Sequence, residues 1–303
     1  MEYAFTRSNR EHFGKKPSWL KRRIAFGSEI QDVIGIIKNN NIHTVCQEAR
    51  CPNLGECFSK KTATFLILGN CCTRNCRFCA VKHGVPEKPD PKEPALVGKA
   101  AKNMGLHYAV ITSVTRDDLL DGGAAIYAET IQEIRKKISS VLVEVLIPDF
   151  MGKEDALRKV TEASPDVINH NIETVSRLYS SVRPQAVYQR SLCLLSKVRE
   201  FNPNIYTKSG IMLGLGEKPE EIRNTMQDLL VSGCQILTIG QYLQPSKEHL
   251  KVQRFVTPEE FVYWKKTALE LGFQAVTSGP FVRSSYHAGD IYRSLERSAM
   301  STC

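Results

Sequence analysis

The feature that most constrains the fold is a regular alternation of two kinds of segment, which begins near residue 62. Six short runs of apolar and β-branched residues alternate with six amphipathic stretches. The runs cover 62–69, 108–114, 141–147, 166–171, 205–213 and 235–240, and the stretches cover 95–104, 122–138, 153–162, 186–200, 218–232 and 258–271. Nearly continuous apolar runs are typical of parallel strands buried on both faces. The pattern therefore predicts six β/α units with right-handed crossovers.

These units favour an α/β fold with a partial (β/α)6 barrel of the TIM type. A doubly wound sheet fits less well, because no glycine-rich dinucleotide motif follows the first strand. Residues 1–60 lack the alternation, and we expect them to form an N-terminal extension. Residues 61–278 are expected to form the barrel, and residues 279–303 a C-terminal tail that closes onto it. In such barrels the chemistry lies on loops after the C-terminal ends of the strands.

The composition narrows the possible classes of protein. The chain has 303 residues, of which 42% are apolar and 24% charged, as in globular proteins. Its longest apolar runs are far shorter than the ~20 residues that cross a bilayer, so we expect no membrane contact. No signal peptide is evident, and a cytoplasmic location is expected, where cysteines stay reduced and more often bind metals. The net charge of +9 favours an anionic partner, but without a nucleic-acid-binding motif we expect no nucleic acid.

Seven of the ten cysteines fall between positions 46 and 79, and six of them form two triplets, with Cys71 as an extra neighbour of the second. The first triplet, in TVCQEARCPNLGECF, consists of Cys46, Cys51 and Cys57. The second, in CCTRNCRFCA directly after the first expected strand, consists of Cys72, Cys76 and Cys79. Three thiolates are one ligand short of a closed tetrahedral site, and an open position is typical of catalytic metals. The alternatives are core packing or zinc, with His83 or Cys71 completing the second site.

The second triplet, with Phe78 before its last cysteine, resembles the signature of radical S-adenosylmethionine enzymes. The resemblance implies that the three thiolates hold three irons of a 4Fe–4S cluster. The fourth iron binds the amino and carboxylate groups of S-adenosylmethionine. One electron from the cluster splits the sulfonium bond and releases a 5′-deoxyadenosyl radical, which removes hydrogen from unactivated carbon.

Further segments, in order from about residue 15 to 290, resemble the lipoyl synthase family. They are KPSWLK, CQEARCPNLGEC, TSVTRDDLLDGGA, VLIPDF, HNIETV, KSGIMLGLGE, LTIGQYLQPS and GPFVRSSYHA. The resemblance implies a sulfurtransferase that inserts two sulfur atoms, at carbons 6 and 8, into an octanoyl chain amide-linked to a lysine of a carrier domain. The product is protein-bound lipoyl, so the reaction belongs to lipoate biosynthesis.

The same resemblance implies a second, auxiliary 4Fe–4S cluster, which is dismantled as it supplies the sulfur. Its ligands would be the first cysteine triplet together with Ser284, and Ser285 is the rival ligand if the register slips by one. The expected catalytic residues are therefore Cys46, Cys51, Cys57 and Ser284. A harder alkoxide oxygen among soft thiolates would make one iron easier to lose.

Polar residues near the ends of the expected strands are candidates for holding S-adenosylmethionine in the barrel mouth. They are Thr112, Ser113, Glu144, Asn171 and Arg183. Such residues also cap helices. Lys208 either faces the substrate channel or pairs with Glu144, and we expect His170 to be a hydrogen-bonding residue rather than a ligand. The acidic cluster at 117–121 is either a solvated helix start or a contact.

The resemblance also implies partners. These are octanoylated lipoyl carrier domains (acyltransferase subunits of 2-oxoacid dehydrogenases and the glycine-cleavage H protein), a reductant such as ferredoxin or flavodoxin, and an iron–sulfur cluster carrier protein. Two alternatives stay open. A radical methylthiotransferase acting on transfer RNA also pairs two clusters, but it usually carries further domains for which this chain has no room. A basic zinc protein that binds nucleic acid would hold zinc and no iron.

Overall fold

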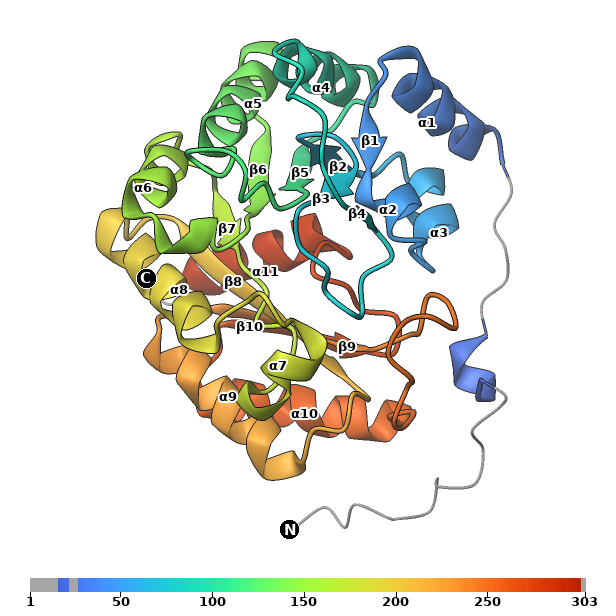
Figure 1. The fold of residues 1–303 in the computed structure, drawn as a ribbon, viewed down its shortest axis with the longest axis vertical. Helices are drawn as coiled ribbons and strands as arrows, with labels where there is room; N and C mark the ends of the chain where they lie inside the picture. The colour runs from blue at the N-terminus through green and yellow to red at the C-terminus, as the bar shows by residue number, and fades with distance from the viewer. Residues whose placement is uncertain (1–15, 22–26, 301–303) are drawn as a thin grey trace.

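The computed structural model describes residues 16–21 and 27–300, and its central element is an eight-stranded sheet (Figure 1). The strand order is β1-β2-β5-β6-β7-β8-β9-β10. The strands are β1 His43–Thr44, β2 Thr64–Ile67, β5 Tyr108–Ser113, β6 Leu142–Leu146, β7 Val167–Asn169, β8 Tyr206–Leu213, β9 Ile236–Gln241 and β10 Ala275–Gly279. All neighbours from β2 to β10 are parallel, and β1 pairs antiparallel with β2. In the described chain β1 and β10 stand at opposite edges, so the barrel is partial and open.

The six expected strands and six expected helices are all present and in the expected order. The helices are α4 Glu93–Asn103, α5 Ala124–Lys137, α6 Glu154–Glu162, α8 Tyr188–Phe201, α9 Pro219–Val231 and α10 Pro258–Leu271. Figure 1 shows them as an arc around the outside of the sheet. Proline at the first helical position starts α9 and α10, and the Thr257 side chain accepts a hydrogen bond from the backbone of Glu260. The α/β partial barrel predicted from the sequence is confirmed.

The two faces of the central strands serve different purposes. Ile111 and Val145, which are paired in register on β5 and β6, are fully buried in the main apolar core. Neighbouring residues on the same strands point to the opposite face, because side chains alternate along a strand. On that face Glu144 is 1% exposed although it is charged. The inner face of the sheet therefore carries the polar groups that a site in the barrel needs.

Two elements near the C-terminus were not revealed by the sequence pattern, and the first of them, β10, lies almost wholly before the expected tail. β10 adds a parallel strand beside β9, and α11 Ala288–Met300 follows it. Ile291, Tyr292 and Leu295 of α11 pack against Val167 and Ile236, which are the first residues of β7 and β9. α11 therefore covers the N-terminal ends of the strands and leaves their C-terminal ends for a site.

The N-terminal segment contains η1 Ser18–Leu20, α1 Ser28–Asn39, α2 Val45–Glu48 and α3 Leu54–Ser59. It is attached to the sheet through β1, whose His43 and Thr44 lie opposite Leu66 and Phe65. A small two-stranded sheet, β3 Cys71–Cys72 and β4 Lys82–His83, shapes the loop after β2. The remaining short elements are η2 Phe150–Gly152, η3 Ser176–Leu178 and α7 Tyr179–Val182. Among the described residues, no helix combines the length and apolar character that a bilayer crossing requires.

Candidate active site

A cavity of about 480 Å³ lies at the C-terminal ends of the parallel strands, and we call it the upper cavity. Its walls come from the loop after β2, from the ends of β5 to β9, and from two segments distant in the sequence, 45–52 and 282–285. The predicted site residues on its walls are Cys46, Cys51, Cys72, Cys76, Cys79, Thr112, Ser113, Asn171, Arg183 and Ser284. The fold therefore brings ten of the predicted residues to one cavity. Cys57 and Glu144 are not on its walls.

The second cysteine triplet lies in the loop that follows β2, and we call residues 68–81 the cluster loop. The Cys72 sulfur accepts hydrogen bonds from the backbone N–H groups of Arg74 at 3.4 Å and Thr115 at 3.3 Å. Burial raises the pKa of the Cys79 thiol to about 12, and burial also raises that of Cys76. A thiol with a raised pKa stays protonated unless a cation stabilises its thiolate, which iron would do. The triplet is therefore suited to a metal cluster rather than to a free reactive thiolate.

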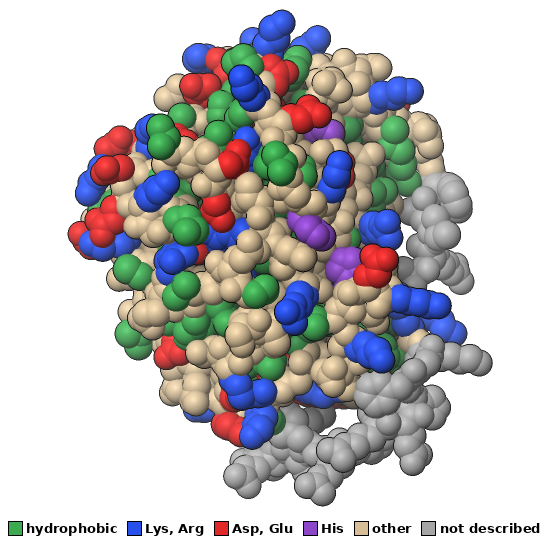
Figure 2. All heavy atoms as spheres, viewed as in Figure 1, with side chains coloured by type: hydrophobic (Ala, Val, Ile, Leu, Met, Phe, Trp, Pro, Cys, Tyr) green, Lys and Arg blue, Asp and Glu red, His purple; other side chains and the backbone are tan. Residues whose placement is uncertain are grey.

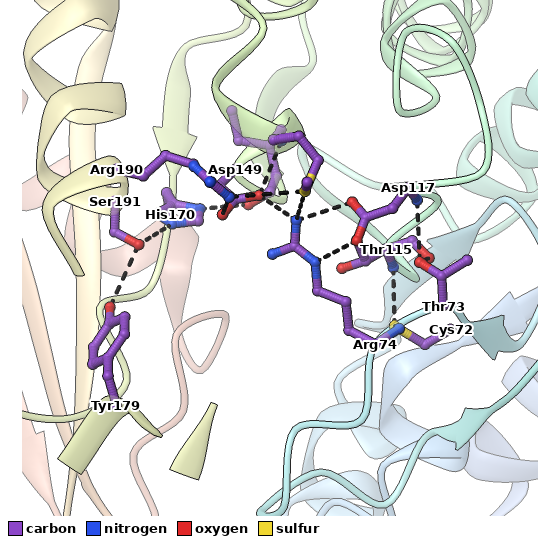
Figure 3. Close-up of polar contacts among 12 residues, drawn as sticks. Cys72, Thr73, Arg74, Thr115, Asp117, Asp149, His170, Tyr179, Arg190 and Ser191 are labelled. Atoms are coloured by element: carbon purple, nitrogen blue, oxygen red, sulfur yellow. Dashed lines mark hydrogen bonds and ion pairs between the residues drawn. The ribbon is translucent and has the colours of Figure 1, made fainter. Parts of the chain in front are cut away.

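Arg74 holds this loop in place from within (Figure 3). Its side chain is nearly buried, and its Nε and Nη2 atoms bind Asp117 at 2.6 and 2.9 Å. Nη2 also lies 2.5 Å from Asp149 Oδ1, and Arg190 binds the other oxygen of Asp149 at 3.2 Å. Although burial alone would raise it, the contact with Arg74 lowers the pKa of Asp149 to about 2. Arg74 thus joins the cluster loop to the loops after β5 and β6.

Thr73, which follows Cys72, makes a second connection between the same loops. The Thr73 hydroxyl donates to the carbonyl oxygen of Thr115 at 3.0 Å and accepts from the backbone N–H of Asp117 at 3.1 Å. Asp117 therefore contacts the cluster loop through both its backbone and its side chain. Asp121 instead accepts hydrogen bonds from the backbone N–H groups of Gly123 and Ala125 at the start of α5, so the acidic segment contains both a contact and a helix start. Arg74 was missed from the sequence, because nothing local distinguishes it from a surface arginine.

The wall of the upper cavity contains a buried acceptor that no described residue satisfies. This is Asn171 Oδ1, whereas Asn171 Nδ2 donates to Glu173 at 3.1 Å and lies 3.4 Å from the Ser284 hydroxyl. A Cβ atom added at Gly210 would lie 2.9 Å from this oxygen, so the glycine keeps the space beside it open. Buried acceptors in proteins almost always have a donor. The amine or ribose hydroxyls of S-adenosylmethionine fit this requirement.

Glu173 is a cavity-lining acid that sequence reasoning missed. Its backbone has φ of 65°, in the left-handed region that side chains other than glycine rarely adopt. Burial raises the pKa of its carboxyl group, and the positive charge of Arg183 opposes that shift. Strain and burial at one cavity residue are typical of functional positions. Its position two residues after Asn171, where the fourth strand was expected to end, was the available signal.

Arg183 approaches the cavity from the end of α7. Its Nη1 atom donates to the carbonyl oxygens of Asn171 at 3.0 Å and Ile172 at 3.3 Å. Burial raises the pKa of Cys76 overall, and the charge of Arg183 acts in the opposite direction. The guanidinium therefore lies beside both the cluster loop and Asn171, although its role as a carboxylate partner stays a prediction.

Glu144 and Lys208 form a buried ion pair in the barrel interior. Lys208 Nζ lies 2.8 Å from Glu144 Oε1, and each side chain is 1% exposed. The hydroxyl of Tyr108 donates to Glu144 Oε2 at 2.7 Å, and Asn169 Nδ2 donates to Oε1 at 3.3 Å. Of the two roles left open for Lys208, the structure shows the pair with Glu144. Glu144 is engaged by these neighbours and does not line the upper cavity.

His170 is a hydrogen-bonding residue, as predicted. Its Nδ1 donates to the carbonyl oxygen of Ile147 at 2.8 Å, and Nε2 lies 2.9 Å from the hydroxyl of Ser191 (Figure 3). Burial, followed by the charge of Arg183, lowers the pKa of His170 to about 4. The ring is therefore neutral at neutral pH and helps to hold the end of β7 in place.

The first cysteine triplet is spread over α2, the following loop and α3. Burial raises the pKa of Cys46 to about 12 and that of Cys57 to about 11, and the charge of Cys51 adds to both shifts. The three sulfurs therefore lie near enough to affect one another. Asn53 Nδ2 donates to the carbonyl oxygen of Phe281 at 2.7 Å, which brings the serine segment beside the triplet across 228 residues of sequence.

A second cavity of about 340 Å³, the lower cavity, lies on the other side of this triplet. Cys57 lines only the lower cavity, and Ser284 lines only the upper one. Cys46, Cys51 and Ser285 line both. The thiols and the serine are thus arranged around the boundary between two cavities, and this donor set of soft sulfur with one oxygen fits iron.

Comparison with known proteins identifies the family. Residues 66–229 match the model of the radical SAM superfamily, and residues 2–51 match the N-terminal domain of lipoyl synthase of that family. The chain is 57% identical over 283 residues to a lipoyl synthase of Caldanaerobacter subterraneus subsp. tengcongensis, covering 93% of this chain and 99% of the relative. The chain belongs to the lipoyl synthase family. A lipoyl synthase of Rubrobacter xylanophilus is 52% identical over 299 residues, covering 99% of this chain and 93% of the relative.

Solved structures support the fold. SuiB of Streptococcus suis bound to S-adenosylmethionine matches with a TM-score of 0.56 at 10% identity, covering 74% of this chain and 54% of that one. Methylornithine synthase matches with a TM-score of 0.51 at 12% identity, covering 86% and 81%. As a member of the lipoyl synthase family, the protein is a radical S-adenosylmethionine enzyme that uses S-adenosylmethionine and 4Fe–4S clusters and acts on lipoyl carrier proteins. The methylthiotransferase and zinc-protein alternatives are not favoured.

Proposed function

We propose that the protein converts octanoyl-lysine on a carrier domain into lipoyl-lysine, by inserting sulfur at carbons 6 and 8. The observation that carries this proposal is that one cavity is lined by cysteines of both triplets, Cys46 and Cys51 from the first and Cys72, Cys76 and Cys79 from the second. When bound, S-adenosylmethionine and its cluster supply a radical that removes hydrogen from carbon, and the auxiliary cluster supplies sulfur. A shared cavity allows one substrate chain to meet both.

The residues around the upper cavity have different proposed roles, according to their chemistry. Aliphatic side chains, among them Leu146, Ile147, Met212 and Leu243, line the upper cavity and suit an eight-carbon chain from which water is excluded. Asn171, Glu173 and Arg183 offer hydrogen bonds to the polar groups of S-adenosylmethionine. The second triplet would hold the radical-generating cluster. Cys46, Cys51, Cys57 and Ser284 would hold the auxiliary cluster.

The carrier is proposed to dock over the mouth of the upper cavity. Lys16 and Arg50 are exposed, and both line this cavity. On the face seen in Figure 2, Lys and Arg side chains lie at the centre and right with few acidic side chains among them, whereas acidic and basic side chains are mixed at the upper left. Because opposite charges steer association, these two residues favour an acidic carrier domain.

The finer partners follow from the family and the cysteine chemistry. We propose as carriers the acyltransferase subunits of 2-oxoacid dehydrogenases and the glycine-cleavage H protein. A reductant such as ferredoxin or flavodoxin would supply electrons, and an iron–sulfur cluster carrier protein would supply the iron and sulfide of the clusters. A cytoplasmic location suits an enzyme whose thiols must stay reduced.

An anaerobic assay tests the proposed function. Protein reconstituted with iron and sulfide is mixed with dithionite, S-adenosylmethionine and an octanoylated lipoyl domain, and the domain is analysed by mass spectrometry. We expect a mass gain of two sulfur atoms. Cys72→Ala is expected to form neither 5′-deoxyadenosine nor product, whereas Cys57→Ala is expected to form 5′-deoxyadenosine without product. A carrier that gains no sulfur from the fully reconstituted enzyme would overturn the proposal.

A further inference from the structure

The lower cavity is not used by the proposed reaction, and its position suggests a separate role. β2 and β5 are paired in register, with Thr64 opposite Val110 and Leu66 opposite Thr112. The upper cavity is lined by the second of these pairs, which is nearer the C-terminal ends of the strands. The first pair lines the lower cavity, and Thr64 lines both. The two cavities therefore follow each other along the barrel wall, and the first cysteine triplet lies between them.

The lower cavity reaches solvent on its own side of the molecule. Its walls include exposed residues from three separate segments, the end of α3, the turn before β5 and the start of α11. The exposed residues are Lys60, Lys61, Thr62, Gly105, His107, Asp290 and Arg293. The upper cavity opens at the opposite ends of the strands. A molecule in the lower cavity can therefore reach Cys57 without passing the substrate.

The lower wall carries a set of charged and titratable groups that contact one another. His287 lies between two carboxylates, with Nε2 3.2 Å from Glu56 and Nδ1 2.9 Å from Asp290. Lys60 binds Glu56 at 3.1 Å, and Arg293 binds Asp290 at 2.6 Å. Charged groups of both signs at the exposed mouth of a cavity suit small hydrated ions. The lower cavity therefore offers polar groups to an ion on the same side of the triplet as Cys57.

We propose that the lower cavity is the passage through which iron and sulfide reach and leave the auxiliary site, while the upper cavity is reserved for S-adenosylmethionine and the acyl chain. This inference rests on the proposed function, because it takes the first triplet as the auxiliary ligands. In this proposal two ligands of the same auxiliary site contact different cavities. Cys57 lines the lower cavity, through which iron and sulfide pass, and Ser284 lines the upper cavity, which holds the substrate.

The test measures iron rather than product, so that it is independent of sulfur insertion. Cys72, Cys76 and Cys79 are replaced by alanine, which leaves the first triplet as the proposed cluster site. Ferrous iron and sulfide are added anaerobically, and cluster formation is followed by absorbance and Mössbauer spectroscopy. Iron removal is followed with an anionic ferrous chelator. His107→Trp and Arg293→Trp, in two separate segments that line the lower cavity, are each added to this background.

We expect each tryptophan to slow cluster formation and iron removal several-fold while the final iron content is unchanged. The matched control is Val231→Trp, which is exposed on α9, lines neither cavity, and is expected to have no effect. Thermal unfolding followed by circular dichroism confirms that each variant is folded. Equal rates in all variants, with a complete cluster, would overturn the passage and leave the proposed function intact. If no cluster forms even without a tryptophan, the ligand assignment in the proposed function fails instead.

A second arm of the experiment uses the upper cavity. In the protein with both triplets intact, S-adenosylmethionine and an octanoyl-lysine peptide are added before the chelator, without reductant. We expect the rate of iron loss from the auxiliary site to change little, because its route does not pass the occupied cavity. Strong protection by these two ligands would show that iron leaves through the upper cavity, and would overturn the proposal.

Discussion

Arg74 and Asp149 are joined by a buried contact of 2.5 Å, which ties the loop carrying the second cysteine triplet to the loop after β6. Their side chains are 4% and 1% exposed. A buried charge is tolerated only when it is paired, and here Arg74 also binds Asp117 while Asp149 also binds Arg190. The cluster loop is thus held by a network of charges and not by apolar packing alone.

The first prediction concerns Arg74 as a positioning residue. Arg74→Gln leaves the buried Asp149 without its closest cation, and we expect the free energy of unfolding to fall by about 3–5 kcal/mol. The iron content of the second triplet and the electron paramagnetic resonance signal of its reduced cluster with S-adenosylmethionine should also decrease, with partial rescue in Arg74→Lys. The control is Arg135→Gln, whose pair with Asp166 lies away from the cluster loop. A normal cluster spectrum in Arg74→Gln would contradict the role.

The second prediction concerns the pH dependence of stability through His170. Its pKa is about 4 in the folded protein against 6.5 for the free side chain, so the folded state binds fewer protons between these values. The stabilisation is present above pH 6.5 and is lost as the pH falls towards 4, by a total of roughly 3 kcal/mol. His170→Asn keeps a donor for the carbonyl oxygen of Ile147 but does not titrate. Urea unfolding across this range should show a shallower loss in the variant, and parallel curves would refute the assignment.

A third prediction addresses the ion pair of Glu144 and Lys208. Lys208→Met leaves the buried carboxylate of Glu144 without its cation and should lower the free energy of unfolding by about 3–5 kcal/mol. The double variant Glu144→Leu/Lys208→Met removes both charges, so its loss should be clearly smaller than the sum of the single losses. Denaturant unfolding of the four proteins measures this coupling. Additive losses would mean that the two side chains do not stabilise each other.

The fourth prediction tests the proposed oxygen ligand of the auxiliary site. Ser284→Cys should still assemble the auxiliary cluster, because it supplies a fourth thiolate. It should insert sulfur poorly, because no iron is then held by the weaker oxygen ligand. Ser285→Ala, which tests the rival ligand, should keep both properties. Iron content and product mass are measured for each protein. A Ser284→Cys enzyme with the product yield of the unchanged enzyme would rule out the idea that an oxygen ligand makes one iron easier to lose.

A fifth prediction concerns docking of the carrier. If Lys16 and Arg50 attract an acidic domain, the dissociation constant should rise on the order of tenfold between low and high salt. Charge reversal at both residues should weaken binding at low salt and flatten the salt dependence. Surface plasmon resonance with an octanoylated lipoyl domain provides the measurement. Binding that is insensitive to salt would argue against electrostatic docking.

The sequence predicted the regular part of the fold because each strand and helix carries its own local period. Where the period was weak, the prediction was incomplete. Residues 275–279 form a short strand with polar residues in its second half, and it is recognised only through its pairing with β9. α11 is amphipathic, but its apolar face is explained only by the ends of the strands that it covers. Arg74 and Glu173 were missed because their importance comes from distant partners.

By itself, the sequence determined the chemistry of this protein, since cysteine spacing within a short loop dictates which sulfurs can share a cluster. Only the tertiary structure decided how those groups face one another. Ser284 and Cys57 are separated by more than two hundred residues, yet they lie on the walls of adjoining cavities on either side of Cys46 and Cys51. The reason is physical. Ligand identity is a local property of the chain, whereas cavities and buried charge pairs exist only after distant segments have packed.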